Sequence, residues 1–326
     1  MTNALTSTRI KRHLRREEDD TQREWKSGHT PVRAHKSVLV KEVIDLLAPK
    51  DGEIVIDGTA GQGGHSEALL KEARIKLVAL DADPTAVEAT SARLKRYGAR
   101  AEVVNANFAA LHQVLAKKGV EQVDAVLLDL GWRQEQLAQG RGFSFQQDEP
   151  LVMSYGAKPA SGFTAAEILN EWSEKTIADV LFGYGEERYA KRIAKAVVAR
   201  REIKPIETTY ELVEIIRDSV PPHYRHGKIN CATRSFQALR VAVNDELGVI
   251  DKGVRAAWQH LAPGGRIAVI SFHSTEDRIV KRLFLELAKD NGTILTKKPI
   301  TATQEELTHN PSARSAKLRG IRKNND

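Results

Sequence analysis

Short apolar runs alternate with helical patterns over residues 51–130, and this alternation restricts the fold more than any other feature of the chain. The runs expected to form buried strands lie at residues 53–56, 76–80, 101–104 and 123–130. Helices are expected over residues 66–72, from Pro84, which suits a first helical turn, and over residues 109–117. Strands that alternate with helices at this spacing favour a parallel, doubly wound α/β sheet.

The alternation stops near residue 140. Residues 140–235 carry little strand signal and several helical patterns, including 186–201, where Tyr189, Ile193 and Val197 recur four residues apart. A helix, a Gly-rich turn, a strand at 266–270 and a further helix then resume. We therefore expect a flexible basic arm (1–34), a discontinuous α/β domain (35–139 and 236–311), an all-helical insertion domain (140–235) and a basic C-terminal tail (312–326).

The composition excludes several classes of protein. Hydrophobic residues make up 41% of the chain and charged residues 29%, which is enough apolar material for a sizeable core. The apolar runs are far shorter than the ~20 residues of a membrane span, and residues 1–16 lack the apolar core of a secretory signal. The single cysteine, Cys231, can form no internal disulfide and fits a reducing cytosol. We expect a soluble, cytoplasmic protein.

The net charge of +7 is concentrated at the two ends of the chain. Residues 1–34 hold eight basic and five acidic residues, residues 312–326 hold five and one, and the chain between them carries 37 of each. Basic ends on a neutral body suggest contact with a polyanion. Tails that only keep the protein soluble would explain the same pattern.

A glycine-rich loop follows the first expected strand and reads Asp57-Gly-Thr-Ala-Gly61-Gln-Gly63-Gly64-His65-Ser66. Glycines at a strand end let the backbone approach a ligand, and Asp81, which ends the second strand, can accept both hydroxyls of a ribose. The glycine spacing does not fit the G-x-G-x-x-G pattern of dinucleotide folds. Asp57 would also repel a pyrophosphate but attract the amino group of S-adenosyl-L-methionine. A glycine-rich turn without a ligand is the alternative.

The next two strand ends add weaker signals. Asn105, Asn107 and Phe108 end the third strand, where a polar group beside an aromatic ring can bind and cover an adenine. Asp129 ends the fourth strand and is followed by Trp132. Plain strand termination, with Trp132 in the core, explains these residues as well.

Several longer motifs carry a resemblance to a known family. They are DGTAGQGGHS (57–66), DADP (81–84), RGFSF (141–145), YGEER (184–188), ATRSFQ (232–237), SFHS (271–274), EDRIVK (276–281) and NPSARS (310–315). On these motifs the chain, from His35 to its C-terminal segment, resembles the RsmH (MraW) family. Members of this family are S-adenosylmethionine-dependent methyltransferases that modify N4 of a cytidine in 16S ribosomal RNA.

The resemblance implies a fold, a cofactor and a set of contacts. The fold is a class I (Rossmann-like) methyltransferase sheet with an inserted all-helical domain, which agrees with the pattern above. The cofactor is S-adenosyl-L-methionine, and the partner is 16S ribosomal RNA or the small ribosomal subunit. Carried over residue by residue, the cofactor contacts fall on Gly63, Gly64, His65, Asp81, Phe108, Asp129 and Gln136.

The chain departs from the family at a few positions. The family's Val-Ser-Ser is replaced by Trp132-Arg133-Gln134, and its Leu-Asp-Met-Arg-Met-Asp segment reads Leu151-Val-Met-Ser-Tyr-Gly156. Ser37 and Cys231 each replace a proline of the family. The first two changes lie where the target base is expected, so they bear on the substrate more than on the cofactor.

An exocyclic cytosine amine is a poor nucleophile, so the enzyme must orient it and accept a hydrogen bond or proton from it. We expect Asp129 to be that acceptor, with binding of the cofactor as its alternative role. Trp132 can stack on a flipped-out base or belong to the core. The ten histidines show no spacing typical of a zinc site, so no catalytic metal is expected.

Contacts with RNA are expected from the helical insertion and the tails. Residues 186–201 carry a set of cations that can contact phosphates: Arg188, Lys191, Arg192, Lys195, Arg200 and Arg201. A solvated helix face explains them equally well, and Arg188 can pair with Glu186 or Glu187. His273 can touch the substrate or serve as a structural histidine.

Three functions compete on this evidence. The first is a 16S ribosomal RNA cytosine-N4 methyltransferase. The second is a paralogue with an altered base site that methylates another RNA or binds RNA without turnover, suggested by the changes at 132–134 and 152–155. The third, a nicotinamide-dependent oxidoreductase, is disfavoured by the glycine spacing. The sequence does not indicate an oligomeric state.

Overall fold

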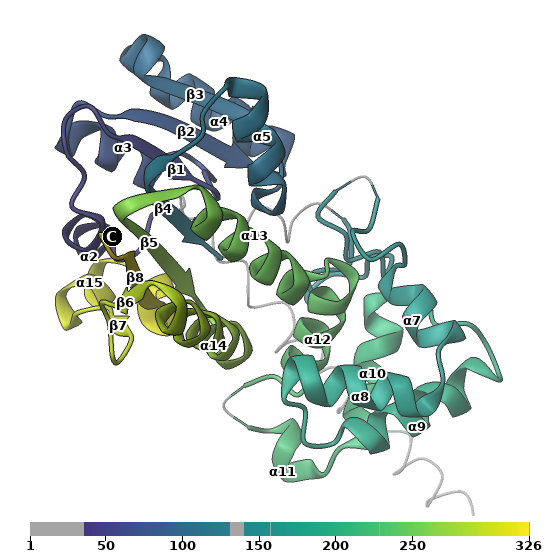
Figure 1. Ribbon diagram of the computed structural model, residues 1–326. Helices are drawn as coiled ribbons and strands as arrows, with labels where there is room; N and C mark the ends of the chain where they lie inside the picture. The colour runs from purple at the N-terminus through teal and green to yellow at the C-terminus, as the bar shows by residue number, and fades with distance from the viewer. Residues whose placement is uncertain (1–35, 131–139, 157, 228, 326) are drawn as a thin grey trace, which may run out of the picture. The chain divides into compact units, whose positions relative to one another are not determined.

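The computed structural model describes residues 36–130, 140–156, 158–227 and 229–325. Its sheet has the strand order β3-β2-β1-β4-β5-β8-β6, and β7 pairs with β8 (Figure 1). The pairs among β1 to β5 are all parallel, whereas β8 runs antiparallel to β5, β6 and β7. The strands are β1 (Ile54–Asp57), β2 (Lys76–Asp81), β3 (Ala101–Asn105), β4 (Val123–Asp129), β5 (Leu261–Ser271), β6 (Gly292–Ile294), β7 (Ile300–Thr301) and β8 (Lys317–Lys323).

Helices cover both faces of this sheet, and the strand sequences reflect it. Val55 packs in one apolar core and its neighbour Ile56 in another, because successive strand side chains point to opposite faces. One core takes side chains from α5 (Leu111–Lys118), α13 (Glu246–His260) and α14 (Ser274–Asp290). The other takes them from α2 (Val40–Leu47), α3 (Gly64–Glu72) and the end of α4 (Pro84–Leu94). The strands of a parallel sheet that is buried on both faces have short, continuous apolar sequences, as these strands do.

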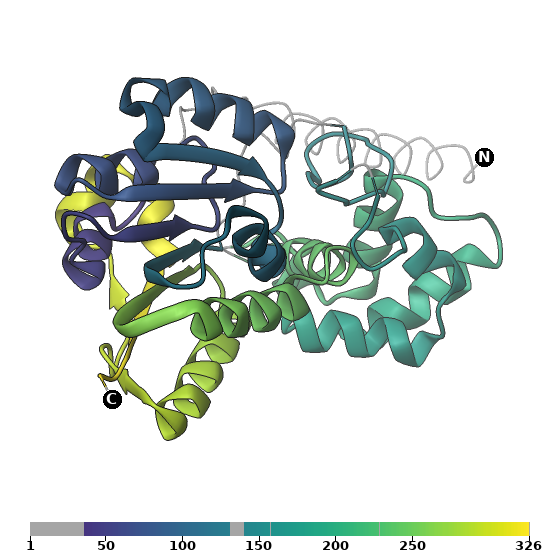
Figure 2. The same ribbon diagram turned by 45° about the horizontal axis from the view of Figure 1, so that its top comes forward.

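A separate apolar core lies in the helical segment, which Figure 2 shows in teal and green apart from the sheet. Its helices are α7 (Ala165–Glu171), α8 (Glu174–Gly185), α9 (Ala190–Arg201), α10 (Thr209–Ser219), α11 (Pro222–Arg225) and α12 (Thr233–Val243). The predicted domain boundary at 235/236 falls inside α12, whose Phe236, Leu239 and Val243 are buried in this core. The predicted α/β fold with an inserted helical domain is confirmed.

The helix expected over residues 186–201 covers only the later part of this range, Ala190–Arg201. α8 ends at Gly185, and Glu186 adopts a left-handed conformation (φ 52°) before α9 begins at Ala190. The turn is fixed by Glu187, which is fully buried and accepts hydrogen bonds from the backbone of Tyr189 (2.9 Å) and the hydroxyl of Tyr224 (2.9 Å). A buried carboxylate with dedicated donors stabilises the break that the apolar spacing alone did not reveal.

The basic C-terminal segment is not a tail. Residues Lys317–Lys323 form β8, between β5 and β6, and Leu318 and Ile321 are fully buried. The charge does not prevent this, because Arg319 donates hydrogen bonds to Asp277 at 2.6 and 3.1 Å. The prediction for 312–326 was therefore wrong, and the arm at 1–34 lies outside the described residues.

Candidate functional site

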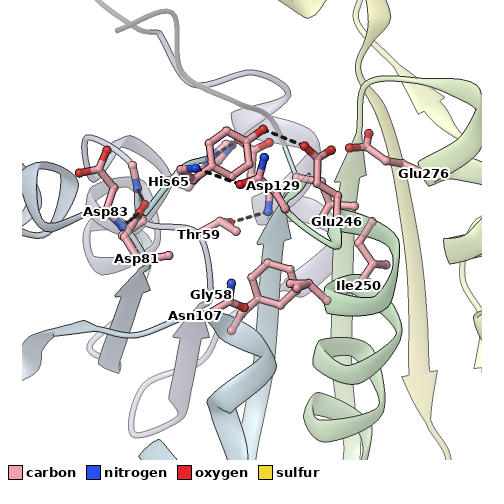
Figure 3. A pocket seen from close by; sticks show the side chains of 18 of the residues that line it. Gly58, Thr59, His65, Asp81, Asp83, Asn107, Asp129, Glu246, Ile250 and Glu276 are labelled. Atoms are coloured by element: carbon pink, nitrogen blue, oxygen red, sulfur yellow. Dashed lines mark hydrogen bonds and ion pairs between the residues drawn. The ribbon is translucent and has the colours of Figure 1, made fainter. Parts of the chain in front are cut away.

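A cavity lies beyond the carboxyl ends of β1, β2 and β4, where the glycine-rich loop turns into α3 (Figure 3). The loop needs glycine for two reasons. Gly61 and Gly63 have positive φ values of 57° and 76°. At Gly58, a Cβ would lie only 2.5 Å from Leu128 Cδ2. Gly58 and Gly61 line the cavity, so their backbone is directly accessible to a ligand.

Asp81 is held at the rim of this cavity by backbone donors. The Gly61 N–H donates to its Oδ2 at 2.8 Å, and the Asp83 N–H donates to its Oδ1 at 2.9 Å. Asp83 in turn caps α4 by accepting a hydrogen bond from the Thr85 N–H at 2.8 Å, with Pro84 in the first helical turn. A carboxylate held in this orientation at the end of β2 suits the two hydroxyls of a ribose.

Phe108 and Ile250 form an apolar side of the cavity. Phe108 opens a short 3₁₀ turn (Phe108–Ala110) that Asn107 caps by accepting a hydrogen bond from the Ala109 N–H. Its ring packs against Gly253 in α13 so closely that a Cβ there would overlap the ring. A planar, apolar side beside Asn107 can cover an adenine ring.

Asp129 ends β4 in the middle of the cavity rim. Its backbone N–H donates to Thr59 Oγ1 at 2.6 Å, and its Oδ2 lies 3.6 Å from Nδ1 of the buried His65. Nε2 of His65 lies 2.8 Å from the carbonyl oxygen of Val38, so that nitrogen carries a proton. The structure thus brings Gly61, His65, Asp81, Phe108 and Asp129 to one cavity, as the sequence predicted.

Three predicted contacts do not line the cavity: Asp57, Gly63 and Gly64. Asp57 is 1% exposed and accepts hydrogen bonds from Ser66 Oγ (2.6 Å) and the Thr59 N–H (3.2 Å). Burial raises the pKa of Asp57 above its ordinary value. Gly64 makes room for Ser37, because a Cβ there would overlap the Ser37 hydroxyl. Asp57 and Gly64 therefore support the conformation of the glycine-rich loop without lining the cavity.

Two further predicted residues, Trp132 and Gln136, lie outside the described residues. His273 does not line the cavity; it caps α14 by accepting a hydrogen bond from the Glu276 N–H at 3.4 Å. Of the expected phosphate contacts, Arg201 donates to the carbonyl oxygens of Leu169 (2.9 Å) and Trp172 (2.7 Å), which gives it a structural role. The exposed cations are Arg188, Lys191, Arg192 and Lys195.

The glycine and strand-end signals of the sequence do not reach one whole side of the cavity, which is built by Tyr155, Asn244, Glu246 and Glu276. Tyr155 lies in the segment that departs from the family pattern, and Glu246 and Glu276 are in the first turns of α13 and α14. The departure from the family pattern at 151–156 points to Tyr155, whereas no strand end or glycine pattern points to Asn244, Glu246 or Glu276. Figure 3 shows Glu246 and Glu276 on the side of the cavity opposite Asp81 and Asp83, with Asp129 between them.

Glu246, His273 and Glu276 also place three possible metal ligands within 4.8 Å of one another. Arg240 already donates two hydrogen bonds to Glu246, at 2.8 and 3.1 Å, so this carboxylate has a cationic partner. Glu276 is 2% exposed and accepts hydrogen bonds from the backbone of Phe272 and His273. We assign no metal to this cluster.

In the described parts of the chain no helix combines the length and apolar character needed to cross a membrane. The model of the MraW methylase family matches residues 32–324. The ribosomal RNA small subunit methyltransferase H of Heliobacterium modesticaldum is 44% identical over 309 residues, which cover 89% of this chain and 98% of that protein. The enzyme of the same name from Rhodospirillum centenum is 43% identical over 303 residues, covering 87% and 91%. Among solved structures, an rRNA methylase from Streptococcus thermophilus matches with 13% identity and a TM-score of 0.43, covering 89% of this chain and 99% of that one.

Proposed function

Because the chain belongs to the MraW methylase family, we propose that it transfers the methyl group of S-adenosyl-L-methionine to N4 of a cytidine in 16S ribosomal RNA. The observation that carries this proposal is the cavity at the carboxyl ends of β1, β2 and β4, which joins Asp81, Phe108 and Asp129. The reaction would take place in the cytoplasm, with the small ribosomal subunit or its RNA as partner. The names of the relatives from Heliobacterium modesticaldum and Rhodospirillum centenum support this substrate.

The side chains at the cavity fit this cofactor. Asp81 would accept the ribose hydroxyls, Phe108 and Ile250 would flank the adenine, and the loop at Gly61 would pass close to the amino acid part. The acidic groups suit a cofactor that carries an ammonium and a sulfonium but no phosphate. When bound, it supplies a methyl group on a positively charged sulfur, which is ready for transfer without a metal.

The protein must then orient the amine and take up its proton. Asp129 lies at the end of β4, and we assign it the hydrogen bond from the amine, which aligns the nitrogen lone pair with the methyl–sulfur bond. His65, whose Nδ1 lies 3.6 Å from Asp129, fixes the position of that carboxylate. Trp132 and Gln136, outside the described residues, remain proposed as a stacking partner of the base and a cofactor contact.

One experiment tests the proposal directly. Small-subunit RNA from cells with and without the gene is digested and mapped by mass spectrometry. We expect loss of a single N4-methylcytidine in the cells without the gene, and its return when the purified protein and S-adenosyl-L-methionine are added to that RNA. An unchanged set of modified nucleotides would contradict the proposal.

A second candidate function is favoured by one observation. Tyr155 lines the cavity at a position where the family pattern has methionine, so the site for the base differs from that pattern. A paralogue acting on another RNA would have such a difference. Mapping total cellular RNA in the same cells separates the two, because the lost methyl group would then lie outside the small-subunit RNA.

A further inference from the structure

The cavity has a side that the cofactor contacts do not explain. Those contacts come from the ends of β1, β2 and β4 and from Phe108, whereas Tyr155 belongs to the segment that follows residue 140 and Glu246 to α13. Figure 3 places Asp129 between Glu246 and the cofactor side at Asp81. A group that receives a methyl from the cofactor near Asp129 can approach along this second side.

Tyr155 is fixed rigidly on that side. Its N–H donates to Asn244 Oδ1 at 2.9 Å, and its carbonyl oxygen accepts a hydrogen bond from Arg141 at 2.8 Å. Its ring stacks on Phe143, with the centroids 5.3 Å apart and 13° between the planes. Since Phe143 covers one face, the surface that lines the cavity belongs to the other face or to the edge of the ring.

The hydroxyl of Tyr155 also has a fixed partner. It donates to Glu246 Oε1 at 2.9 Å, and the same carboxylate accepts two hydrogen bonds from Arg240. Burial holds the pKa of Tyr155 well above its usual range, so the phenol is neutral at physiological pH. A neutral aromatic ring whose proton is committed to Glu246 is a poor base but a good surface for a planar group.

We propose that Tyr155 forms the wall of the acceptor-base site, where a flipped-out, amine-bearing pyrimidine packs against its ring with the amine directed to Asp129. This inference rests on the proposed function and names the part of the site that receives the base. Glu246 and Asn244 act as positioning residues, because they hold Tyr155 and leave the base itself to its ring. A base–aromatic contact changes binding by about 5- to 150-fold.

The test compares Tyr155→Phe and Tyr155→Met in the full-length protein. Phenylalanine keeps the ring, so we expect kcat/KM for small-subunit RNA within about threefold of the wild type. Methionine, the residue of the family pattern, removes the ring, and we expect kcat/KM to fall by about 5- to 150-fold. The affinity for S-adenosyl-L-methionine should change less than twofold in both variants. Tyr97→Met, at a tyrosine that does not line the cavity, serves as the matched control.

A second measurement keeps this inference separate from the proposed function. Cytidine is titrated into the protein saturated with S-adenosylhomocysteine, and Tyr155→Met should weaken its binding while Tyr155→Phe should not. If the wild type does not methylate small-subunit RNA, the proposed function fails and this titration alone decides. Wild-type behaviour of Tyr155→Met in the deciding measurement would overturn the inference, as would an equal loss in both variants together with a lower melting temperature.

Discussion

Asp81 connects the sheet to the loop that would hold the cofactor. The carboxylate stands at the end of β2 and receives N–H groups from Gly61 in the loop and from Asp83 at the start of α4. Backbone donors of this kind fix the side chain in one rotamer before a ligand arrives. A ribose would therefore meet a carboxylate whose orientation costs little further entropy.

Replacement of Asp81 by alanine should weaken the binding of S-adenosyl-L-methionine by about 1.5–3 kcal/mol, the range for hydrogen bonds to a charged group. The reason is the loss of both ribose contacts and of the support for the Gly61 loop. Isothermal titration calorimetry measures the change. Asp218→Ala, at an exposed aspartate on α10, should leave the affinity unchanged. An unaltered dissociation constant in a folded Asp81→Ala protein would remove the assignment.

Individual residues were predictable where they follow a strand. Asp81 and Asp129 are the last residues of β2 and β4, and His65 and Phe108 lie in the segments that follow β1 and β3. A parallel sheet gathers such residues at one edge. Glu276, like His65, lies in a helix after a strand end, but no glycine-rich loop precedes it and its place in the cavity depends on tertiary packing. Asp57 carried the expected signal but faces Ser66, which no spacing rule reveals.

Among the elements, α13 shapes the apolar side of the cavity through Gly253 and Ile250. Gly253 allows the ring of Phe108 to lie against the helix, and Ile250, one turn earlier, lines the cavity beside it. The helix itself is amphipathic, with Ile250, Val254 and Ala257 in the core under β4 and β5. The same apolar face of α13 therefore packs the helix on the sheet and lines the cavity.

We expect Gly253→Ala to lower the affinity for S-adenosyl-L-methionine by about tenfold, which corresponds to about 1.4 kcal/mol. The added methyl group overlaps the Phe108 ring, and overpacking of this kind costs about 1–3 kcal/mol unless the ring moves toward the cavity. Gly183→Ala in α8 is the matched control, because a Cβ there meets no atom within 4 Å. Wild-type cofactor affinity in Gly253→Ala would show that the ring can move elsewhere.

The helix α10 depends on a charge at its N-terminus. Glu211 accepts hydrogen bonds from Lys204 Nζ (2.7 Å) and from the backbone N–H groups of Glu207 (2.8 Å) and Thr208 (3.2 Å). With Thr208 it forms a capping box. The Lys204 hydrogen bond and the backbone donors lower the pKa of Glu211 from 4.5 to about 2.

Glu211→Gln should reduce the free energy of unfolding by about 1 kcal/mol at pH 7, because glutamine can keep the cap but not the charge. A carboxyl whose pKa is lower in the folded state than in the unfolded state stabilises the fold at pH values above the unfolded-state pKa. This stabilisation is lost as the pH falls toward the folded-state pKa. The difference between the two proteins should therefore shrink as the pH drops from about 4.5 toward about 2. Urea unfolding at several pH values measures it, with Glu214→Gln on the same helix as the control. A difference that does not depend on pH would exclude the charge as its cause.

At the scale of the molecule, the order of elements was predictable and the place of the C-terminal segment in the sheet was not. The alternation of apolar runs fixes a parallel sheet, and its interruption after residue 140 marks the insertion. The C-terminal segment was predicted to be a tail because its many basic residues hide the short apolar pattern of a strand. In β8 they flank buried Leu318 and Ile321, and Arg319 pairs with Asp277, which is 42 positions away. A short stretch of sequence does not show that one of its residues will pair with a residue so distant in the chain.

We expect the N-terminal end of the chain to contribute more to RNA contact than the C-terminal end. Lys323 donates to the carbonyl oxygens of Leu261 (2.9 Å) and Trp258 (3.3 Å), so part of the C-terminal charge is used within the fold. Residues 1–34, which carry a net charge of +3, lie outside the described residues. Because each phosphate neutralised releases counterions, cations at this end should appear as a salt dependence of RNA binding.

Deletion of residues 1–34 should therefore lower the affinity for small-subunit RNA and flatten its salt dependence, while the affinity for S-adenosyl-L-methionine stays the same. Loss of three phosphate contacts would reduce the slope of log K against log salt by about 2 for a single strand. A triple variant, Arg9→Gln with Arg12→Gln and Arg15→Gln, keeps the length of the arm and should reproduce most of the effect. Filter binding between low and moderate salt measures both slopes. If the slopes of the deletion and the wild type coincide, the arm only keeps the protein soluble, and the exposed cations of α9, such as Lys191 and Lys195, become the expected phosphate contacts.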